Sequence, residues 1–348
     1  MKKVKILTFH FADNYGALLQ AYALKKYLEE REMEVEFINY IPGSERYFYE
    51  INPLKGKGIK GKIKKLLEFG ARYDSKIRFD DFREVNLNIK KEQPLNFENC
   101  DLLIVGSDQV WNEKIVKDLR PYLFSDVGRD SKKISYAASI GCNDFADETK
   151  ELFKKYLKDF EAVSVRERTA ELALAEMGIS STTVVDPVFL LDKMVWKDIA
   201  LKPRNFLSDK PYILMYLLRE DSASIKKAND FAKNNNMEVY YIHPLGKKMK
   251  NLNGKYVHNV GPREFLWLID NAHVVFTNSF HAVSFSIILE SKFYHFSHSQ
   301  LGDRVKNLLE MFECKDAGES IKECELKSKK YELIRKSSMM FLEKNISE

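Results

Sequence analysis

His281 occupies a position that suits acid–base chemistry. It lies in TNSFHAVSFS, residues 277–286, directly after the strand-like run HVVF. The next residues predict a helix that Asn278 and Ser279 cap, which places His281 in its first turn. A helix N-terminus binds phosphate or carboxylate well, because its free N–H groups carry a partial positive charge. Asn278 and Ser279 are therefore also candidates for binding an anionic donor. A histidine beside such an anion could act as a general acid, and the alternative is a histidine satisfied within the core.

Two arginines could hold the anion. Arg166 ends a predicted strand in AVSVRER, residues 162–168. Its planar fork suits bidentate capture of a carboxylate or phosphate, whereas the alternative is a surface salt bridge with Glu167 or Glu171. Arg304 lies near the start of another predicted helix and is the second candidate for donor binding.

A dense polar set follows another predicted strand, in GSDQVWN at residues 106–112. Asp108 could be the base for an attacking hydroxyl, and Trp111 could offer an apolar face on which a sugar stacks. The alternative is a hydrogen-bonded loop between domains. The residues expected to contact an acceptor are Ser107, Gln109, Trp111 and Asn112 here, and Asn14, Tyr15 and Gly16 at the first helix, where simple capping is the alternative.

The remaining histidines and the cysteines form no metal-ligand pattern. His243-Pro244 ends a predicted strand, where a turn is the simpler interpretation and a nucleotide contact the other. The cysteines are Cys100, Cys142, Cys314 and Cys324, and no pair has C-x-x-C spacing. We therefore expect a metal-independent reaction and reduced thiols, as in a cytoplasmic protein.

Alternating strands and helices must position these residues. VKILTFH, ALLQAYALKKYLEERE and VEFINY read as strand, helix and strand, and this alternation continues after an interruption. It predicts an α/β protein of two Rossmann-like domains that face each other across a cleft, with ligands bound beyond the carboxyl ends of the strands. The predicted parts are a first domain at 1–191 with a basic helical insertion at 43–98, a linker at 192–209, a donor-binding domain at 210–318, and a C-terminal helix at 319–348 that packs back on the first domain.

The positive charge is concentrated in the insertion. Residues 55–78 carry nine Lys/Arg and two acidic residues, and the whole chain has a formal net charge of +5. The block is either a solvated face, peripheral to catalysis, or a patch for an anionic acceptor or a membrane surface. It lacks the motifs of nucleic-acid recognition. No stretch approaches the length of a membrane span. We expect a cytoplasmic protein, with peripheral contact at the inner face of the cell membrane through residues 55–78 as the further hypothesis.

Six motifs in order resemble the polysaccharide pyruvyl transferase family. They are NYGALLQAYAL (14–24), VGSDQVWN (105–112), SYAAS (135–139), SVRE (164–167), DPVFLL (186–191) and TNSFHAVSFSI (277–287). The resemblance implies a GT-B-like fold and transfer of pyruvate from phosphoenolpyruvate to a sugar of a cell-surface glycan or its precursor, as a ketal. The acceptor is then a glycan or a lipid-linked sugar. The resemblance implies no cofactor beyond phosphoenolpyruvate as co-substrate, and it implies His281 as the acid and Arg166 as a donor contact.

The chain departs from the family pattern at the histidine. Family members often carry Arg before Leu-His-Gly, where this chain reads Ser279-Phe280-His281-Ala282. Two other functions therefore stay open: a GT-B glycosyltransferase that uses a nucleotide sugar, and a non-catalytic GT-B-like binding protein.

Overall fold

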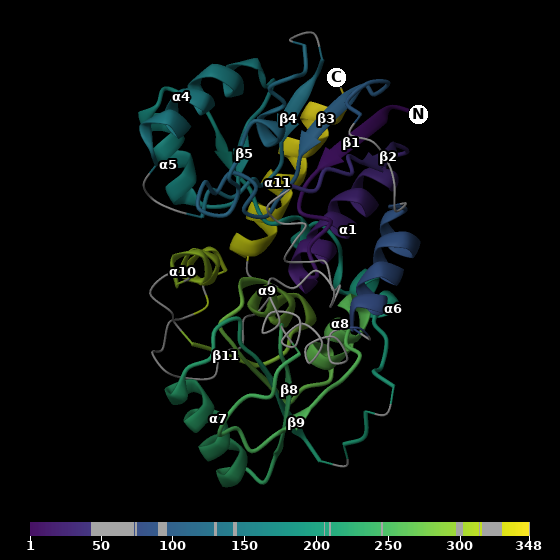
Figure 1. Cartoon of the computed structure of the whole chain (residues 1–348), viewed down its shortest axis with the longest axis vertical. Helices are drawn as coiled ribbons and strands as arrows, with labels where there is room; N and C mark the ends of the chain where they lie inside the picture. Colours follow the sequence, from purple (N-terminus) through teal and green to yellow (C-terminus); the bar gives the residue numbers. More distant parts are fainter. Residues whose placement is uncertain are drawn as a thin grey trace, which may run out of the picture.

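The computed structural model describes residues 1–42, 73, 75–89, 96–128, 131–141, 145–204, 206–208, 210–244, 246–296, 302–312, 314 and 329–347. These residues form two parallel β-sheets with helices packed around them, one sheet in the upper half of Figure 1 and the other in the lower half. The α/β class predicted from the alternation is confirmed.

The first sheet has the order β2-β1-β3-β4. Its strands are β1 Lys3–Leu7, β2 Glu34–Phe37, β3 Leu102–Val105 and β4 Lys133–Ser135, and isolated bridges connect it to the pair β5 Ser164–Val165 and β6 Thr182–Thr183. Its helices are α1 Tyr15–Glu29, α4 Asp147–Tyr156 and α5 Arg168–Glu176, with short 3-10 turns η2 Pro121–Leu123, η3 Leu157–Asp159 and η4 Pro187–Phe189. All four residues of β3 are buried, as expected for a parallel strand covered on both faces.

The second sheet has the order β11-β10-β7-β8-β9. Its strands are β7 Tyr212–Tyr216, β8 Glu238–Ile242, β9 Lys255–Tyr256, β10 Val274–Thr277 and β11 Phe293–His295. Its helices are α7 Ser222–Asn234, α8 Pro262–Asp270, α9 Phe280–Leu289 and α10 Gly302–Met311. The central strands β7 and β10 are wholly buried. Each sheet is thus a Rossmann-like unit with its own crossover helices.

Aromatic contacts fill much of the cleft between the two sheets. Tyr15 at the start of α1 stacks on Phe265 of α8, with ring centroids 4.5 Å apart, and its hydroxyl donates to the carbonyl of Val260. The segment predicted as a linker contains a packed helix, α6 Lys193–Ile199, whose buried Trp196 contacts Tyr22 of α1 and Phe285 of α9. The two units therefore share one apolar core along their facing sides.

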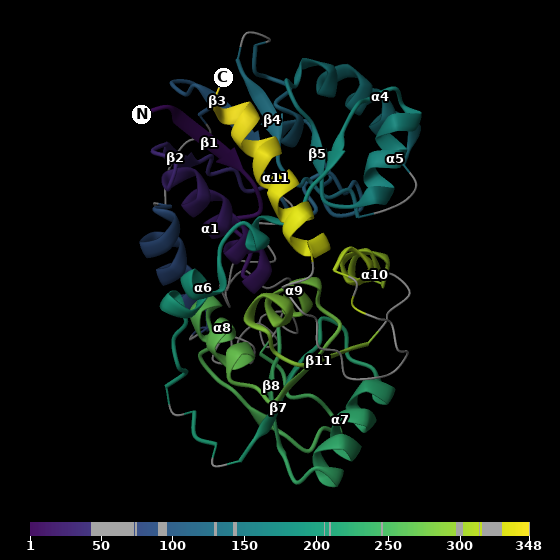
Figure 2. The ribbon, with the colours of Figure 1, turned by 180° about the vertical axis from the view of Figure 1, so that it is seen from behind.

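The C-terminal helix crosses back to the first unit, as predicted. α11, Lys329–Ser347, is drawn in yellow along the first sheet in Figure 2. The backbone N–H of Val185 donates to Ser338, and Arg335 donates to the carbonyl of Phe189. At the C-terminal end of α11, the carbonyl of Ile346 accepts a hydrogen bond from the Lys2 side chain. These bonds tie α11 to the segment that follows β6 and to the residues just before β1.

The end of the insertion lies at the junction of the two units. Residues 75–87 are helical, and most of the basic block 55–78 lies outside the described residues. Phe79 packs on Tyr15 with ring centroids 5.1 Å apart, and Arg78 lies 3.6 Å from Glu264 of α8. That the block is peripheral to catalysis stays a prediction.

The structure also bears on the expectations for the cysteines and for a membrane span. Cys314 is disulfide-bonded, so the expectation of four reduced thiols is wrong for this residue, whereas Cys100 is free. None of the helices in the described ranges combines the length and the apolar character needed to cross a bilayer.

Buried polar contacts hold the loop from β1 to α1. Arg83 donates to the carbonyls of His10 and Phe11 and pairs with Asp13 at 2.6 Å. The His10 ring lies 3.0 Å from the carbonyl of Thr8. Burial lowers the pKa of His10 to about 4, although its hydrogen bonds oppose the shift. His10 is therefore neutral in the folded protein, and the loop that begins α1 depends on that neutrality.

We predict that His10 makes the protein less stable in mild acid. The unfolded chain binds the proton near pH 6.5 and the folded chain only near pH 4, so the free energy of unfolding falls as the pH drops between these values. The full loss is about 3 kcal/mol, at about 1.4 kcal/mol per pKa unit. Urea unfolding at pH 7 and pH 4.5 should show a smaller difference for His10→Gln than for the wild type. An equal difference in both proteins would contradict this role.

Candidate active site

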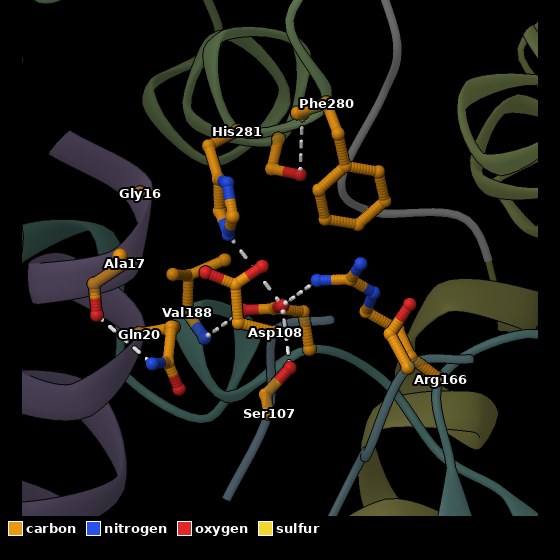
Figure 3. Close-up of polar contacts among 12 residues, drawn as sticks. Gly16, Ala17, Gln20, Ser107, Asp108, Arg166, Val188, Phe280 and His281 are labelled. Atoms are coloured by element: carbon orange, nitrogen blue, oxygen red, sulfur yellow. Dashed lines mark hydrogen bonds and ion pairs between the residues drawn. The ribbon is translucent and has the colours of Figure 1, made fainter. Parts of the chain in front are cut away.

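Strand ends from both sheets converge on one carboxylate, that of Asp186. Ser107 follows β3, Arg166 follows β5 and Asp186 follows β6, whereas His281 lies in the first turn of α9 in the second unit. Figure 3 shows the labelled side chains of Ser107, Arg166 and His281 directed toward this centre. Because the carboxyl ends of parallel strands meet at one edge of a sheet, residues far apart in sequence come together here.

Asp186 is buried and surrounded by donors. Its Oδ2 accepts hydrogen bonds from Ser107 at 3.0 Å and from Nη1 of Arg166 at 2.9 Å, and its Oδ1 accepts from the backbone N–H of Val188. Nε2 of His281 lies 3.6 Å from Oδ2, within ion-pair range and beyond a hydrogen bond. Burial alone would raise the pKa of Asp186, but His281 and Arg166 hold it below its ordinary value. Asp186 is thus an ionised group that lies beside both the Arg166 guanidinium and the His281 ring.

The backbone of α1 holds the other side of the imidazole. A methyl group placed on Gly16 would lie 2.0 Å from Nδ1 of His281, so only glycine allows α1 this close. Asn14 caps the same helix by accepting from the N–H groups of Gly16 and Ala17. The His281 ring is therefore enclosed between the N-terminus of α1 and Asp186.

Arg166 is buried among two carboxylates and a ring. Its Nε donates to Glu167 at 3.2 Å, and Ser139 donates to the same Glu167 oxygen at 2.6 Å. Its guanidinium carbon lies 4.4 Å from the centre of the Phe280 ring. Burial opposes the charge of Arg166, but Glu167 and Asp186 raise its pKa. Within the described ranges, its Nη2 has no hydrogen-bond partner.

Two cavities flank this cluster. The larger one, of about 320 Å³, lies between the end of β5 and α10 and is lined in part by Arg166, Phe280, Arg304 and Asn307. A smaller one, of about 40 Å³, lies on the side of Asn14 and includes Lys76 and His243. His243 lies 2.8 Å from Glu220, and burial lowers its pKa. Both cavities are lined by residues of both units, as expected for a cleft between the domains.

Several side chains of the loop after β3 make internal contacts in place of the sugar contacts that the sequence predicted. Trp111 is fully buried in the core, and its indole donates to the carbonyl of Tyr122, so it presents no face to a ligand. The Ser107 hydroxyl donates a hydrogen bond to Asp186, and the Asn112 amide donates to Gln109. These contacts match the alternative of a hydrogen-bonded loop, although Gln109 keeps partial exposure.

Asp108 stands apart from its neighbours in this loop. Its φ is +76°, a left-handed conformation that non-glycine residues adopt at a cost, and its carbonyl accepts from Ser139. Its charge raises the pKa of Arg166 and counteracts the lowered pKa of Arg304. Asp108 is therefore close to both arginines and is partly exposed.

Three other predicted contacts are internal. Asn278 accepts from the N–H of Leu218 and donates to the carbonyl of Arg219, so its amide is used within the second unit. Ser279, and not Asn278, is the N-cap of α9, where it accepts from Ala282. Tyr15 belongs to the contact between the units.

Sequence reasoning assigned no role to Asp186 or Asn307, and it named Glu167 only as a salt-bridge partner of Arg166. Asp186 stands in the DPVFLL motif, and an acid at the end of a predicted strand was the available signal. Asn307 had no local signal, because only the fold of α10 brings it to Arg166. Within the described ranges, no group of three or more His, Cys, Asp and Glu residues could hold a metal ion.

Solved structures with this architecture define the class. The chain is similar to a protein assigned as a UDP-N-acetylglucosamine 2-epimerase from Listeria monocytogenes, at 12% identity over 98% of this chain and 88% of the other, with a TM-score of 0.52. It is also similar to the UDP-GlcNAc 2-epimerase of Neisseria meningitidis bound to UDP-GlcNAc, at 11% identity over 100% of both chains, with a TM-score of 0.52. At such identities the likeness concerns the fold alone, which is GT-B-like.

The chain belongs to the polysaccharide pyruvyl transferase family, whose sequence profile matches residues 14–300. The resemblance carried by the six motifs is thereby confirmed. No curated protein matches the chain by sequence. The family is one of transferases that modify polysaccharides.

We predict that Gly16→Ala disturbs the contact with His281. Its new methyl group would overlap the imidazole, and overpacking typically costs about 1–3 kcal/mol. Urea unfolding should show this loss. The control is Gly128→Ala, whose added methyl group would meet no atom within 4 Å, and it should change stability by less than about 0.5 kcal/mol. Equal stability of the two variants would mean that α1 does not confine His281.

Proposed function

We propose that this chain transfers pyruvate from phosphoenolpyruvate to a sugar of a cell-surface glycan or its precursor, forming a ketal. The observation that carries the proposal is the placement of His281 beside the ionised Asp186, next to a cavity that contains the cations Arg166 and Arg304. This placement supplies a proton donor and an anion site within one small region. Membership of the pyruvyl transferase family supports the same reaction.

Phosphoenolpyruvate is a small anion with a carboxylate and a phosphate, and the larger cavity has the size and charge for it. A volume of about 320 Å³ falls at the lower end of the range for small-molecule sites. Arg166 is proposed as a donor contact because its Nη2 is buried and has no partner among the described residues. Arg304 from α10 is proposed as the second cation. Ser279 contributes as the cap that fixes the first turn of α9.

The reaction begins with a proton. His281 gives a proton to the methylene carbon of phosphoenolpyruvate, which leaves a cationic centre at the carbon that bears the phosphate oxygen. A sugar hydroxyl attacks that carbon and loses its proton to a base, and phosphate departs with the electrons of the broken C–O bond. A second hydroxyl of the same sugar then attacks the same carbon and closes the ketal, and the released phosphate takes up the proton of that hydroxyl. The Nε2 atom of His281 makes no hydrogen bond within the described ranges and lies 3.6 Å from Oδ2 of Asp186.

Asp186 and Asp108 have separate roles in this proposal. Asp186 is fully buried and bound by Arg166 and Ser107, so it acts as a fixed negative charge beside the His281 ring. Asp108 is partly exposed and is proposed as the base that takes the hydroxyl proton. The acceptor would approach from the side of Asn14 and Gly16, where the smaller cavity lies. Metal independence, a cytoplasmic location and membrane contact through residues 55–78 belong to the proposal as well.

We predict that His281→Asn keeps the fold and most of the affinity for phosphoenolpyruvate while it lowers turnover. Asparagine is close in size and donates hydrogen bonds, but it delivers no proton at neutral pH. The expected loss is about 10²–10⁴-fold, the usual contribution of general acid–base catalysis. Turnover is measured as phosphate released from phosphoenolpyruvate in the presence of nucleotide-linked and lipid-linked sugars.

The matched control is His273→Asn, an exposed histidine just before β10. It should leave turnover within about twofold, because surface substitutions away from a site have small effects. A loss of several kcal/mol of stability in His281→Asn would make His281 a structural residue. Full activity in that variant would place the acid elsewhere.

A further inference from the structure

The cavity beside Arg166 contains hydrogen-bond donors that the described residues do not satisfy. Arg166 is 5% exposed, and its Nη2 is buried without a partner among them. Nδ2 of Asn307 on α10 is also buried without a hydrogen-bond partner among the described residues, and Arg166 and Asn307 line the same cavity. Because a buried donor without an acceptor is unfavourable, one ligand with several oxygens would satisfy both atoms at once.

The two arginines of this cavity also favour an anionic ligand. Arg304 stands three residues before Asn307, so both lie on one face of α10. Burial lowers the pKa of Arg304, and the nearby charge of Arg166 lowers it further. Two partly or fully buried guanidinium groups that repel each other gain stability when an anion lies between them.

We propose that Arg166, Arg304 and Asn307 form the subsite for the phosphate group of the donor. This inference rests on the proposed function and assigns one end of phosphoenolpyruvate to a defined set of residues. A phosphate monoester has three terminal oxygens and about two negative charges near neutral pH, whereas a carboxylate has two oxygens and one charge. Two guanidinium groups and an amide match the phosphate in number of donors, and the charge of Arg166 is shared with Glu167 and Asp186, which line the same cavity. Nη1 of Arg166 is bound to Asp186, which leaves Nη2 for the ligand.

Inorganic phosphate, a product of the proposed reaction, is expected to bind the same subsite. Phosphate that leaves the donor is released within its own subsite, so inorganic phosphate binds the free protein there. It therefore competes with phosphoenolpyruvate, whereas pyruvate, which carries only a carboxylate, competes much less.

The test is isothermal titration calorimetry of the full chain with potassium phosphate at constant ionic strength, with chloride as the background salt. The variants are Arg304→Met and Asn307→Leu, and the control is Lys306→Met, since the Lys306 side chain on the same helix is 70% exposed. Arg304→Met should weaken phosphate binding at least tenfold and Asn307→Leu at least threefold. Lys306→Met should bind as the wild type does. Thermal unfolding in chloride checks the fold of each variant, and Arg304→Lys, which keeps the charge and loses the fork, replaces Arg304→Met if the latter does not fold.

The outcomes separate this inference from the proposed function. Absence of phosphate binding, or equal binding by all variants, overturns the subsite, whether or not phosphoenolpyruvate binds. Phosphate binding that responds to Arg304 and Asn307 supports the subsite. If such a protein fails to bind phosphoenolpyruvate, the subsite stands and the proposed function fails.

Discussion

The site depends on the compensation of one buried charge, the carboxylate of Asp186. An isolated carboxylate in the interior is strongly unfavourable, and here Arg166, Ser107, a backbone N–H and His281 offset it. These groups come from the ends of β3 and β5, from the segment after β6 and from α9 of the other unit. This single charge therefore links residues of both units. Removal of the carboxylate would leave Nη1 of the buried Arg166 without its hydrogen-bond partner.

The close contact between α1 and α9 separates the proposed donor side of His281 from the proposed acceptor side. Gly16 lets the backbone of α1 touch the His281 ring, and Tyr15 stacks on Phe265 to hold the units together. The cations of the larger cavity lie on one side of this contact, and Asn14 lies on the other. Donor and acceptor would thus approach one histidine from opposite flanks, which suits a reaction that joins two separately bound molecules.

Local patterns in the sequence predicted the frame of the site, and packing decided the rest. Strand periodicity followed by a polar cap placed His281 correctly in the first turn of a helix, because both signals lie within a few residues. Trp111 could not be placed in the same way, since its burial depends on Phe153 and Tyr122 from later segments. Asp186 was overlooked because its partners lie 20 and 79 residues away in the chain. The role of Asn307 depends on how α10 packs against the end of β5.

Nuclear magnetic resonance of the reaction in D₂O tests the central claim most directly. Protein, phosphoenolpyruvate, UDP-GlcNAc and a set of glycan and lipid-linked sugars would be incubated together. The account predicts that phosphoenolpyruvate disappears, inorganic phosphate appears, and the sugar gains a ketal methyl group with one deuterium from solvent, delivered by His281. Unchanged phosphoenolpyruvate in a mixture where the nucleotide sugar is consumed would contradict the account and identify the chain as a glycosyltransferase.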